Sequence, residues 1–177
     1  KPFAKKAVDG IRQIVEGAGY ELALLEKYTD KSELLSAVAD VDALIIRSDK
    51  VTAEVIEAAR NLKIVVRAGA GYDNVDLAAA TARGIVVMNT PGQNSNAVAE
   101  LALAMMIFMA RNGFTPGTGS EIQGKTLGIH AYGNVGRLVG RKGKAMGMNV
   151  IAYDPFIIDS AVFEADGVKK VNSVEEL

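Results

Sequence analysis

The residues with the clearest chemical meaning form the segment Ala131-Tyr132-Gly133-Asn134-Val135-Gly136. The segment follows a predicted strand and opens a predicted helix, and it matches the G-x-G-x-x-G fingerprint except at its first position. In such loops the middle glycine lets the backbone approach a pyrophosphate, and the last glycine lets the helix pack closely on the strand. Free N–H groups at the helix start then attract phosphate. The segment therefore predicts a dinucleotide site.

Alanine stands where the fingerprint has its first glycine, which normally allows a tight turn. This departure is mild unless the turn needs a positive φ, a conformation that glycine adopts far more readily. Ala131 is therefore the local feature that most weakens the prediction.

An acidic residue, Asp154, ends the next predicted strand, about 20 residues after the glycine loop, where Rossmann units carry the residue that binds the adenosine ribose. A carboxylate accepts hydrogen bonds from a 2′-OH and repels a 2′-phosphate. Pro155 and the three residues after it offer no arginine for such a phosphate. The pattern favours NAD over NADP. The alternative is that the glycines only form a tight turn and that Asp154 is a turn residue.

These residues lie in a chain that alternates helical and strand patterns, which predicts an α/β fold of βα units with parallel sheets. The predicted helices span 3–17, 31–38, 52–59, 75–83, 97–110, 135–146 and 160–165, and the predicted strands span 22–25, 43–46, 63–67, 85–88, 126–130, 149–153 and 168–171. Thr52 and the segment 94–96 are expected to cap their helices. Residues 111–124 are interpreted as a hinge or crossover between two units. Both ends look cut, because the chain opens in a helix and closes on what looks like a first helical turn.

The composition is that of an ordinary globular protein, with 49% hydrophobic and 23% charged residues and a net charge of −1. Nothing in this balance attracts nucleic acid or an anionic membrane, and no stretch approaches the roughly 20 apolar residues of a spanning helix. The chain has no cysteine and one histidine, which excludes thiol chemistry and a multi-histidine metal site. We predict a cytoplasmic protein without a metal site.

Several segments together resemble the D-2-hydroxyacid dehydrogenases. Residues 125–155 resemble the cofactor domain of that family, and residues 67–76, from Arg67 to Asp76, resemble its R-A-G-x-G-x-D-N-V-D motif. Residues 46–48, 87–91 and 94–100 match further family segments in the right order. The motifs are most similar to the members that oxidise 3-phosphoglycerate to 3-phosphohydroxypyruvate in serine biosynthesis.

The resemblance implies a flavodoxin-like substrate-domain part over residues 1–93. A crossing helix and the first half of a Rossmann NAD-binding domain follow over 94–177. It also implies that backbone N–H groups at Gly69, Ala70 and Gly71 bind the substrate carboxylate. Ala70 replaces a hydroxyl residue common in the phosphoglycerate enzymes, which removes one possible hydrogen bond.

Three polar residues complete the substrate site that the resemblance implies. Arg47 and Arg67 would neutralise an anionic substrate, with Arg47 the better match to a phosphate-contacting arginine, and Asn94 would lie near substrate and cofactor. As alternatives, the arginines are ordinary charges at strand ends and Asn94 is only a helix cap.

The family's catalytic arginine, glutamate and histidine would lie beyond residue 177, so we assign no catalytic residue to this chain. His130 does not replace the family histidine, because it lies in the strand that feeds the glycine loop. There we expect it to be packed or hydrogen-bonded. The 177 residues alone are expected to be inactive.

Other functions remain open: a glycerate or hydroxypyruvate reductase or another D-2-hydroxyacid dehydrogenase, or an NAD-binding corepressor-like module. The helix 97–110 is apolar on nearly all sides and must be buried by more than its own sheet. Because the family places this helix in a dimer interface, we expect a homodimer or a higher homo-oligomer. Burial inside one chain is the alternative.

Overall fold

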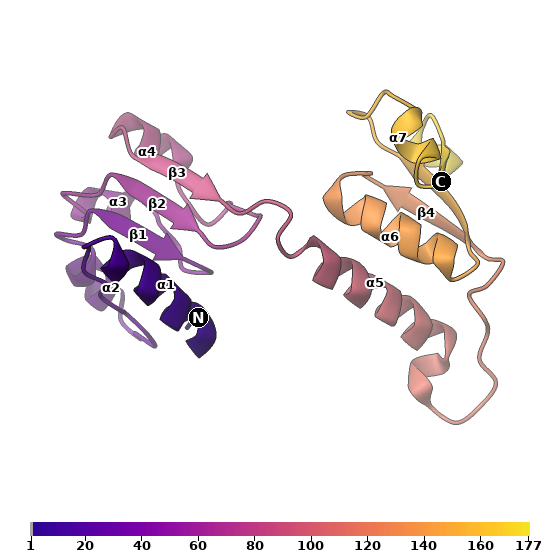
Figure 1. The fold of residues 1–177 in the computed structure, drawn as a ribbon, viewed down its shortest axis with the longest axis horizontal. Helices are drawn as coiled ribbons and strands as arrows, with labels where there is room; N and C mark the ends of the chain where they lie inside the picture. The colour runs from indigo at the N-terminus through magenta and orange to yellow at the C-terminus, as the bar shows by residue number, and fades with distance from the viewer. Residues whose placement is uncertain (1) are drawn as a thin grey trace. The chain divides into compact units, whose positions relative to one another are not determined.

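Parallel strands alternate with helices along the whole chain, as the pattern predicts. A computed structural model describes residues 2–177 and divides the chain into two units, Lys1–Pro91 and Gly92–Leu177 (Figure 1). The boundary falls before the long helix α5 (Ser95–Ala110). Residues 111–124, which we expected to join the units, instead lie inside the second unit and connect α5 to strand β4 (Thr126–His130).

The first unit is built on a three-stranded parallel sheet in the order β1-β2-β3. Its strands are β1 (Ala43–Ile46), β2 (Ile64–Arg67) and β3 (Val86–Asn89), and its helices are α1 (Lys5–Gly17), α2 (Lys31–Ala37), α3 (Ala53–Ala58) and α4 (Leu77–Ala82). The carboxyl ends of the strands meet at one edge of the sheet because all three run in the same direction. The loop after β2 therefore lies beside the loop after β3.

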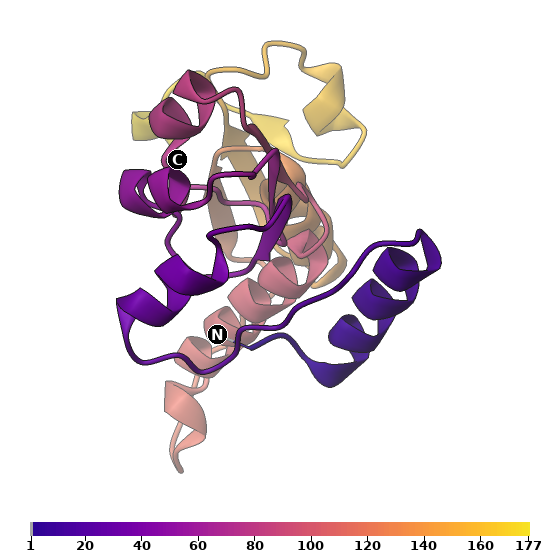
Figure 2. The ribbon, with the colours of Figure 1, turned by 90° about the vertical axis from the view of Figure 1, so that its left-hand side faces the viewer.

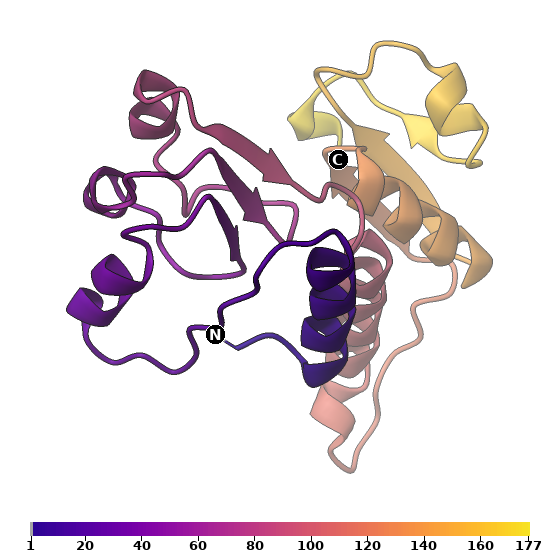
Figure 3. The same cartoon turned by 60° about the vertical axis from the view of Figure 1, so that its left-hand side comes forward.

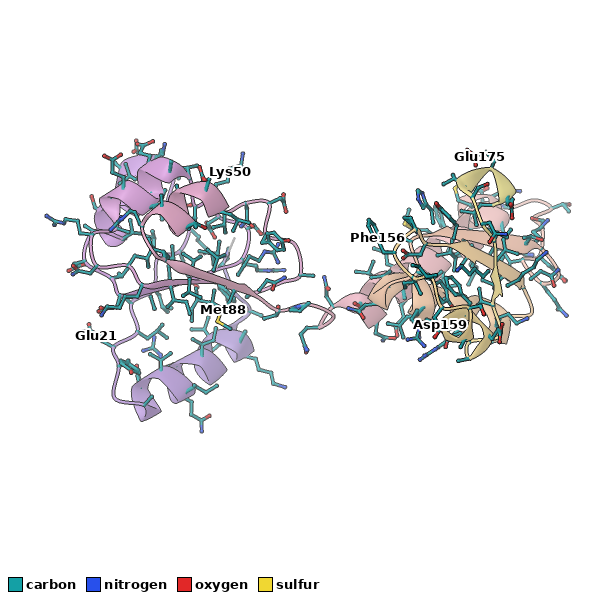
Figure 4. The ribbon with its side chains drawn as sticks, turned by 90° about the horizontal axis from the view of Figure 1, so that it is seen from above. Glu21, Lys50, Met88, Phe156, Asp159 and Glu175 are labelled. Carbon is teal, nitrogen blue, oxygen red and sulfur yellow. The ribbon has the colours of Figure 1, made fainter. Side chains whose placement is uncertain are left out.

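Helices α2, α3 and α4 cover one face of this sheet and enclose the core of the unit with Ile46 and Val65 (Figure 2). On the opposite face Val86 and Met88 are exposed. Figure 4 labels Met88. The alternation of these exposed residues with the partly buried Val87 and Asn89 follows the two-residue period of a strand.

Residues 22–25 form no strand, so that prediction was wrong. The segment runs as extended chain between α1 and α2 (Figure 3). A strand requires a neighbour to pair with, and this segment hydrogen-bonds to none of the described strands. Leu24 and Leu25 are exposed as a result.

The second unit has a three-stranded parallel sheet in the order β4-β5-β6. Strand β5 spans Asn149–Tyr153 and β6 spans Lys169–Lys170, and the helices are α5, α6 (Asn134–Ala145) and α7 (Ala161–Glu164), with short 3-10 turns at Asn112–Phe114 and Val174–Glu176. Helix α6 packs on β4 and β5, and α5 packs along α6. Gly143 of α6 allows this close packing, because a Cβ atom there would lie 3.0 Å from the Leu127 side chain on β4.

Two helix caps differ from those predicted. Thr52 and Asn94 occupy N-cap positions, but neither side chain makes a capping hydrogen bond. Asp30 and Asp76 do cap α2 and α4, and Glu33 completes a capping box at α2. Within residues 2–177 no helix is long and apolar enough to cross a bilayer.

Candidate dinucleotide-binding site

The glycine loop is the turn between β4 and α6, and the backbone is most constrained at its first residue. Ala131 donates its N–H to the Tyr153 carbonyl oxygen at 2.8 Å, which extends the β4–β5 pairing by one bond. The chain then turns sharply with Ala131 at φ +78°. The turn does require the positive φ that favours glycine, so the alanine here carries a conformational cost.

Gly136 has the role that the fingerprint assigns to its last glycine. A Cβ atom at this position would lie 2.2 Å from the Ala131 carbonyl oxygen and 3.3 Å from the Ile129 side chain. Only a residue without a side chain lets the first turn of α6 approach the end of β4 so closely.

Gly133 differs from Gly136 because none of the described residues fills the space beside it. Apart from its two chain neighbours, residues 2–177 place no heavy atom within 4 Å of the position its Cβ would take. Gly133 is the N-cap of α6, and no side chain caps this helix start. The first N–H groups of an α-helix have no intrahelical partner and attract anions. Open space over these groups fits a pyrophosphate, with Asn134 exposed and Val135 packed partly into the core.

Asp154 lies at the end of β5, next to the glycine loop. One carboxylate oxygen accepts the Tyr132 N–H at 2.7 Å and the other accepts the Phe156 N–H at 2.8 Å. Burial would raise the pKa of Asp154, but backbone hydrogen bonds, the largest from Phe156 and Tyr132, hold it below the usual aspartate value. The group is therefore a carboxylate at neutral pH. A carboxylate has about four lone-pair sites, so acceptor capacity remains for a ribose diol.

Tyr132 contributes its backbone to the loop, whereas its side chain points into the protein. The side chain is fully buried and stacks on Phe163, with ring centroids 4.6 Å apart. Its hydroxyl donates to Asp166 at 3.1 Å. Burial, together with the Asp166 charge, raises the pKa of Tyr132 to about 12, so this hydroxyl stays protonated at neutral pH.

Asp166 lies beneath the glycine loop, bonded to the Tyr132 hydroxyl, and the sequence analysis did not identify it. Its carboxylate also accepts hydrogen bonds from Arg137 Nε at 2.9 Å and Arg141 Nε at 2.6 Å. The bond from Arg137 is the largest influence that lowers the pKa of Asp166 to about 2. The available signal was two arginines one turn apart on α6, but nothing in the sequence says which acid they face.

The expected substrate loop of the first unit follows β2. Gly69 and Ala70 are tied to the end of β3, because the Gly69 carbonyl accepts the Thr90 N–H at 2.9 Å and the Ala70 carbonyl accepts Asn89 Nδ2 at 2.8 Å. The Gly69 N–H already bonds the Arg67 carbonyl, at 2.9 Å. Of the three N–H groups proposed to bind a carboxylate, those of Ala70 and Gly71 are the better placed.

The two arginines of this unit lie in different surroundings. Arg67 is half-buried, and its guanidinium lies over Gly69, where a Cβ would come within 1.3 Å of Nη1. Its Nη1 donates to the Ala68 carbonyl at 3.2 Å, and its Nε is buried without a partner in the described chain. Arg47 is exposed just after β1. The structure thus brings Arg67 into contact with the 69–71 loop, whereas Arg47 lies exposed after the neighbouring strand.

The remaining predicted residues belong to the second unit. Asn94 is exposed at the start of α5, and nearby Gly92 lies beside Asn134, whose Nδ2 would be 3.3 Å from a Cβ at Gly92. This places the 92–94 stretch near the glycine loop. Pro155 is exposed next to Asp154. His130 is exposed rather than enclosed, and its ring packs on Tyr153, with centroids 5.9 Å apart.

The family model described as "D-isomer specific 2-hydroxyacid dehydrogenase, catalytic domain" matches residues 3–173. The chain belongs to this family. The resemblance predicted from the sequence is confirmed, and so is the α/β architecture of parallel βα units.

Individual family members show a similar fold and related activities. A crystal structure of NAD+-bound 3-phosphoglycerate dehydrogenase from Entamoeba histolytica is 48% identical, with a TM-score of 0.89 over 99% of this chain and 56% of that one. D-3-phosphoglycerate dehydrogenase of Methanocaldococcus jannaschii is 44% identical over 83% of this chain and 30% of its own length. Hydroxypyruvate reductase of Thermotoga maritima is 43% identical over 76% of this chain and 49% of its own length. The chain thus spans about half or less of these relatives.

Proposed function

We propose that the protein carrying this chain is an NAD-dependent D-2-hydroxyacid dehydrogenase that oxidises 3-phosphoglycerate to 3-phosphohydroxypyruvate. The observation that carries the proposal is the β4–α6 turn, where open space over a helix start lies beside an ionised carboxylate. The similarity to D-3-phosphoglycerate dehydrogenases supports the substrate.

In this proposal the second unit holds the adenosine and pyrophosphate part of NAD. The N–H groups at the start of α6 bind the pyrophosphate over Gly133, and Asp154 accepts hydrogen bonds from the ribose. Phe156, which follows on the same loop and is 91% exposed, offers an apolar surface for the adenine (Figure 4). When bound, NAD supplies the hydride acceptor for C2 of the hydroxy acid.

The first unit binds the substrate. The Ala70 and Gly71 N–H groups bind its carboxylate, and Arg67 supplies a positive charge beside them. Arg47 is the candidate for the phosphate, and Asn94 of the second unit is the candidate for a contact near both ligands. We assign no acid–base residue to this chain and therefore expect it to bind without turning over.

Titration of the 177-residue chain with NADH, followed by fluorescence or calorimetry, tests the cofactor site. We expect saturable binding that is much tighter for NADH than for NADPH, because Asp154 repels a 2′-phosphate. A folded chain that binds neither nucleotide would contradict the proposal.

A substrate panel tests the reaction. We expect no NADH turnover with 3-phosphohydroxypyruvate by this chain, and turnover by a longer protein that includes the rest of the family's cofactor domain. The similarity to a hydroxypyruvate reductase favours that enzyme as the second candidate. Preference for hydroxypyruvate over its phosphorylated form would establish it, and failure to reduce any 2-keto acid would exclude both.

We also propose a cytoplasmic homodimer formed through α5. Leu101, Met105 and Met109 of this helix are 61%, 59% and 73% exposed, which is unusual for large apolar side chains on one helix. Light scattering after size exclusion should give twice the chain mass, and Leu101→Asp should give a monomer. A monomeric wild-type chain would contradict the dimer. The apolar side chains of α5 would then be explained by burial within a single protein.

A further inference from the structure

A polar cluster lies under the glycine loop and is not explained by cofactor contacts. It consists of the Tyr132 hydroxyl, the Asp166 carboxylate and the guanidinium groups of Arg137 and Arg141. The Asp166 side chain is only 2% exposed, although it is charged. A buried carboxylate is costly unless its hydrogen bonds are satisfied, and here three donors satisfy it. The cluster joins the β4–α6 turn to the turn between α7 and β6.

Tyr132 is held at three points, which fixes both its backbone and its side chain. Its N–H bonds Asp154 at 2.7 Å, its ring stacks on Phe163 at 4.6 Å, and its hydroxyl bonds Asp166 at 3.1 Å. The residue directly before it is Ala131, at φ +78°. A non-glycine residue in this region persists only where the surroundings hold it there.

We propose that Tyr132 and Asp166 are positioning residues that hold the strained Ala131 turn in its cofactor-binding conformation. The inference rests on the proposed NAD site. The Tyr132 anchor stabilises the turn that a first-position glycine would adopt without strain. It thereby keeps Gly133 and the start of α6 open to the pyrophosphate and keeps the Tyr132 N–H on Asp154. Neither Tyr132 nor Asp166 needs to touch the ligand through its side chain.

The proposal predicts a specific coupling between Tyr132 and Ala131. Tyr132→Phe keeps the ring on Phe163 but removes the bond to Asp166, so the competent turn should become less populated. If the population falls to about one fifth, the apparent Kd for NADH rises about fivefold, which corresponds to about 1 kcal/mol. Ala131→Gly removes the strain, so adding it to Tyr132→Phe should restore the wild-type Kd. The Ala131→Gly single variant completes the double-mutant cycle, and its Kd shows what the glycine does where the Tyr132 anchor is intact.

Tyr28→Phe is the matched control. It also removes a tyrosine–aspartate hydrogen bond, from Tyr28 to Asp49 at 2.9 Å, but it does so in the first unit. This variant should bind NADH like the wild type. Calorimetric titration of the 177-residue chain and its four variants gives the five values of Kd. An unchanged Kd for Tyr132→Phe, or a loss that Ala131→Gly does not rescue, would overturn the proposal.

Hydrogen exchange without cofactor separates this inference from the proposed function. In the free chain, Tyr132→Phe should speed exchange at the backbone N–H of position 132. Adding Ala131→Gly to this variant should slow the exchange again. If the wild type binds no NADH, the proposed NAD site fails, and the exchange data alone then decide whether the anchor holds the turn. Equal exchange in the wild type and Tyr132→Phe would refute the anchor even if NADH binds.

Discussion

Replacing Gly133 and Gly136 separately by alanine should separate cofactor binding from folding. Both glycines belong to one fingerprint and lie three positions apart, yet their surroundings differ completely. A methyl group at Gly136 meets the backbone of the turn, whereas a methyl group at Gly133 enters open space. The same chemical change should therefore produce opposite results at the two positions.

The size of each effect follows from the contacts. A Cβ at Gly136 would lie 2.2 Å from the Ala131 carbonyl oxygen, whereas ordinary contacts begin near 3.4 Å. The turn or the helix must therefore move by about 1 Å, and because the obstacle is backbone no side-chain rotation relieves it. Overpacking of this kind costs about 1–3 kcal/mol, and we expect Gly136→Ala to lie near the upper end. Gly133 has an ordinary negative φ of −77°, so Gly133→Ala should cost less than about 1 kcal/mol, mainly from the poorer N-cap.

Two measurements on the same samples check the prediction. Urea denaturation gives the free energy of unfolding of the unit, and NADH titration gives the Kd. Gly133→Ala should keep its stability and bind NADH at least about tenfold more weakly, because the methyl group occupies the space of the pyrophosphate. Gly136→Ala should lose stability first. A Gly133→Ala chain that binds NADH like the wild type would show that no pyrophosphate approaches Gly133. A Gly136→Ala chain of unchanged stability would refute the packing argument.

Three further outcomes follow from the described contacts. The pKa of Asp166 is about 2, below the ordinary 3.8. The ionised group therefore stabilises the fold above pH 4 by about 2 kcal/mol, and this contribution is lost as the pH falls toward 2. In Asp166→Asn, the free energy of unfolding measured in urea should therefore fall less between pH 4 and pH 2 than in the wild type. Asp42→Asn removes an exposed ion pair with Lys63 and should leave the unfolding free energy nearly unchanged in the same assay, because solvent screens exposed charges. Gly69→Ala should displace the Arg67 guanidinium and strain the backbone at φ +159°, so it should raise the substrate KM of a longer, active protein and also lower its stability.

The sequence correctly predicted the bounds of three strands that lie beside the candidate sites. Strands β1, β4 and β5 lie where the apolar runs predict them, because β-branched residues between turn signals leave few alternatives. Segment 22–25 has similar apolar residues but no pairing partner, and pairing is not a local property. Whether a short apolar run becomes a strand depends on which edge it can reach.

The site was only partly predictable for a related reason. Asp154 could be proposed from the sequence because the role expected of it fixes its spacing from the glycine loop. Asp166 was missed because its partners, Tyr132 and Arg137, come from other elements and no spacing rule connects them. The sequence could not show whether Ala131 has a positive φ. A backbone angle depends on the contacts that hold the neighbouring residue, here Tyr132, and these contacts come from other elements.

The two backbone hydrogen bonds at Asp154 have a consequence for redesign of the cofactor preference. The obvious route to an NADP-using variant exchanges this acid for a small or basic residue. Here that exchange would also free the Tyr132 and Phe156 N–H groups, so selectivity and loop order would change together. A library that keeps a hydrogen-bond acceptor at position 154 and introduces arginine at the exposed position 155 would change the charge and leave both backbone hydrogen bonds in place. If the proposed site is correct, the residue that would select the nucleotide is also a structural part of the glycine loop.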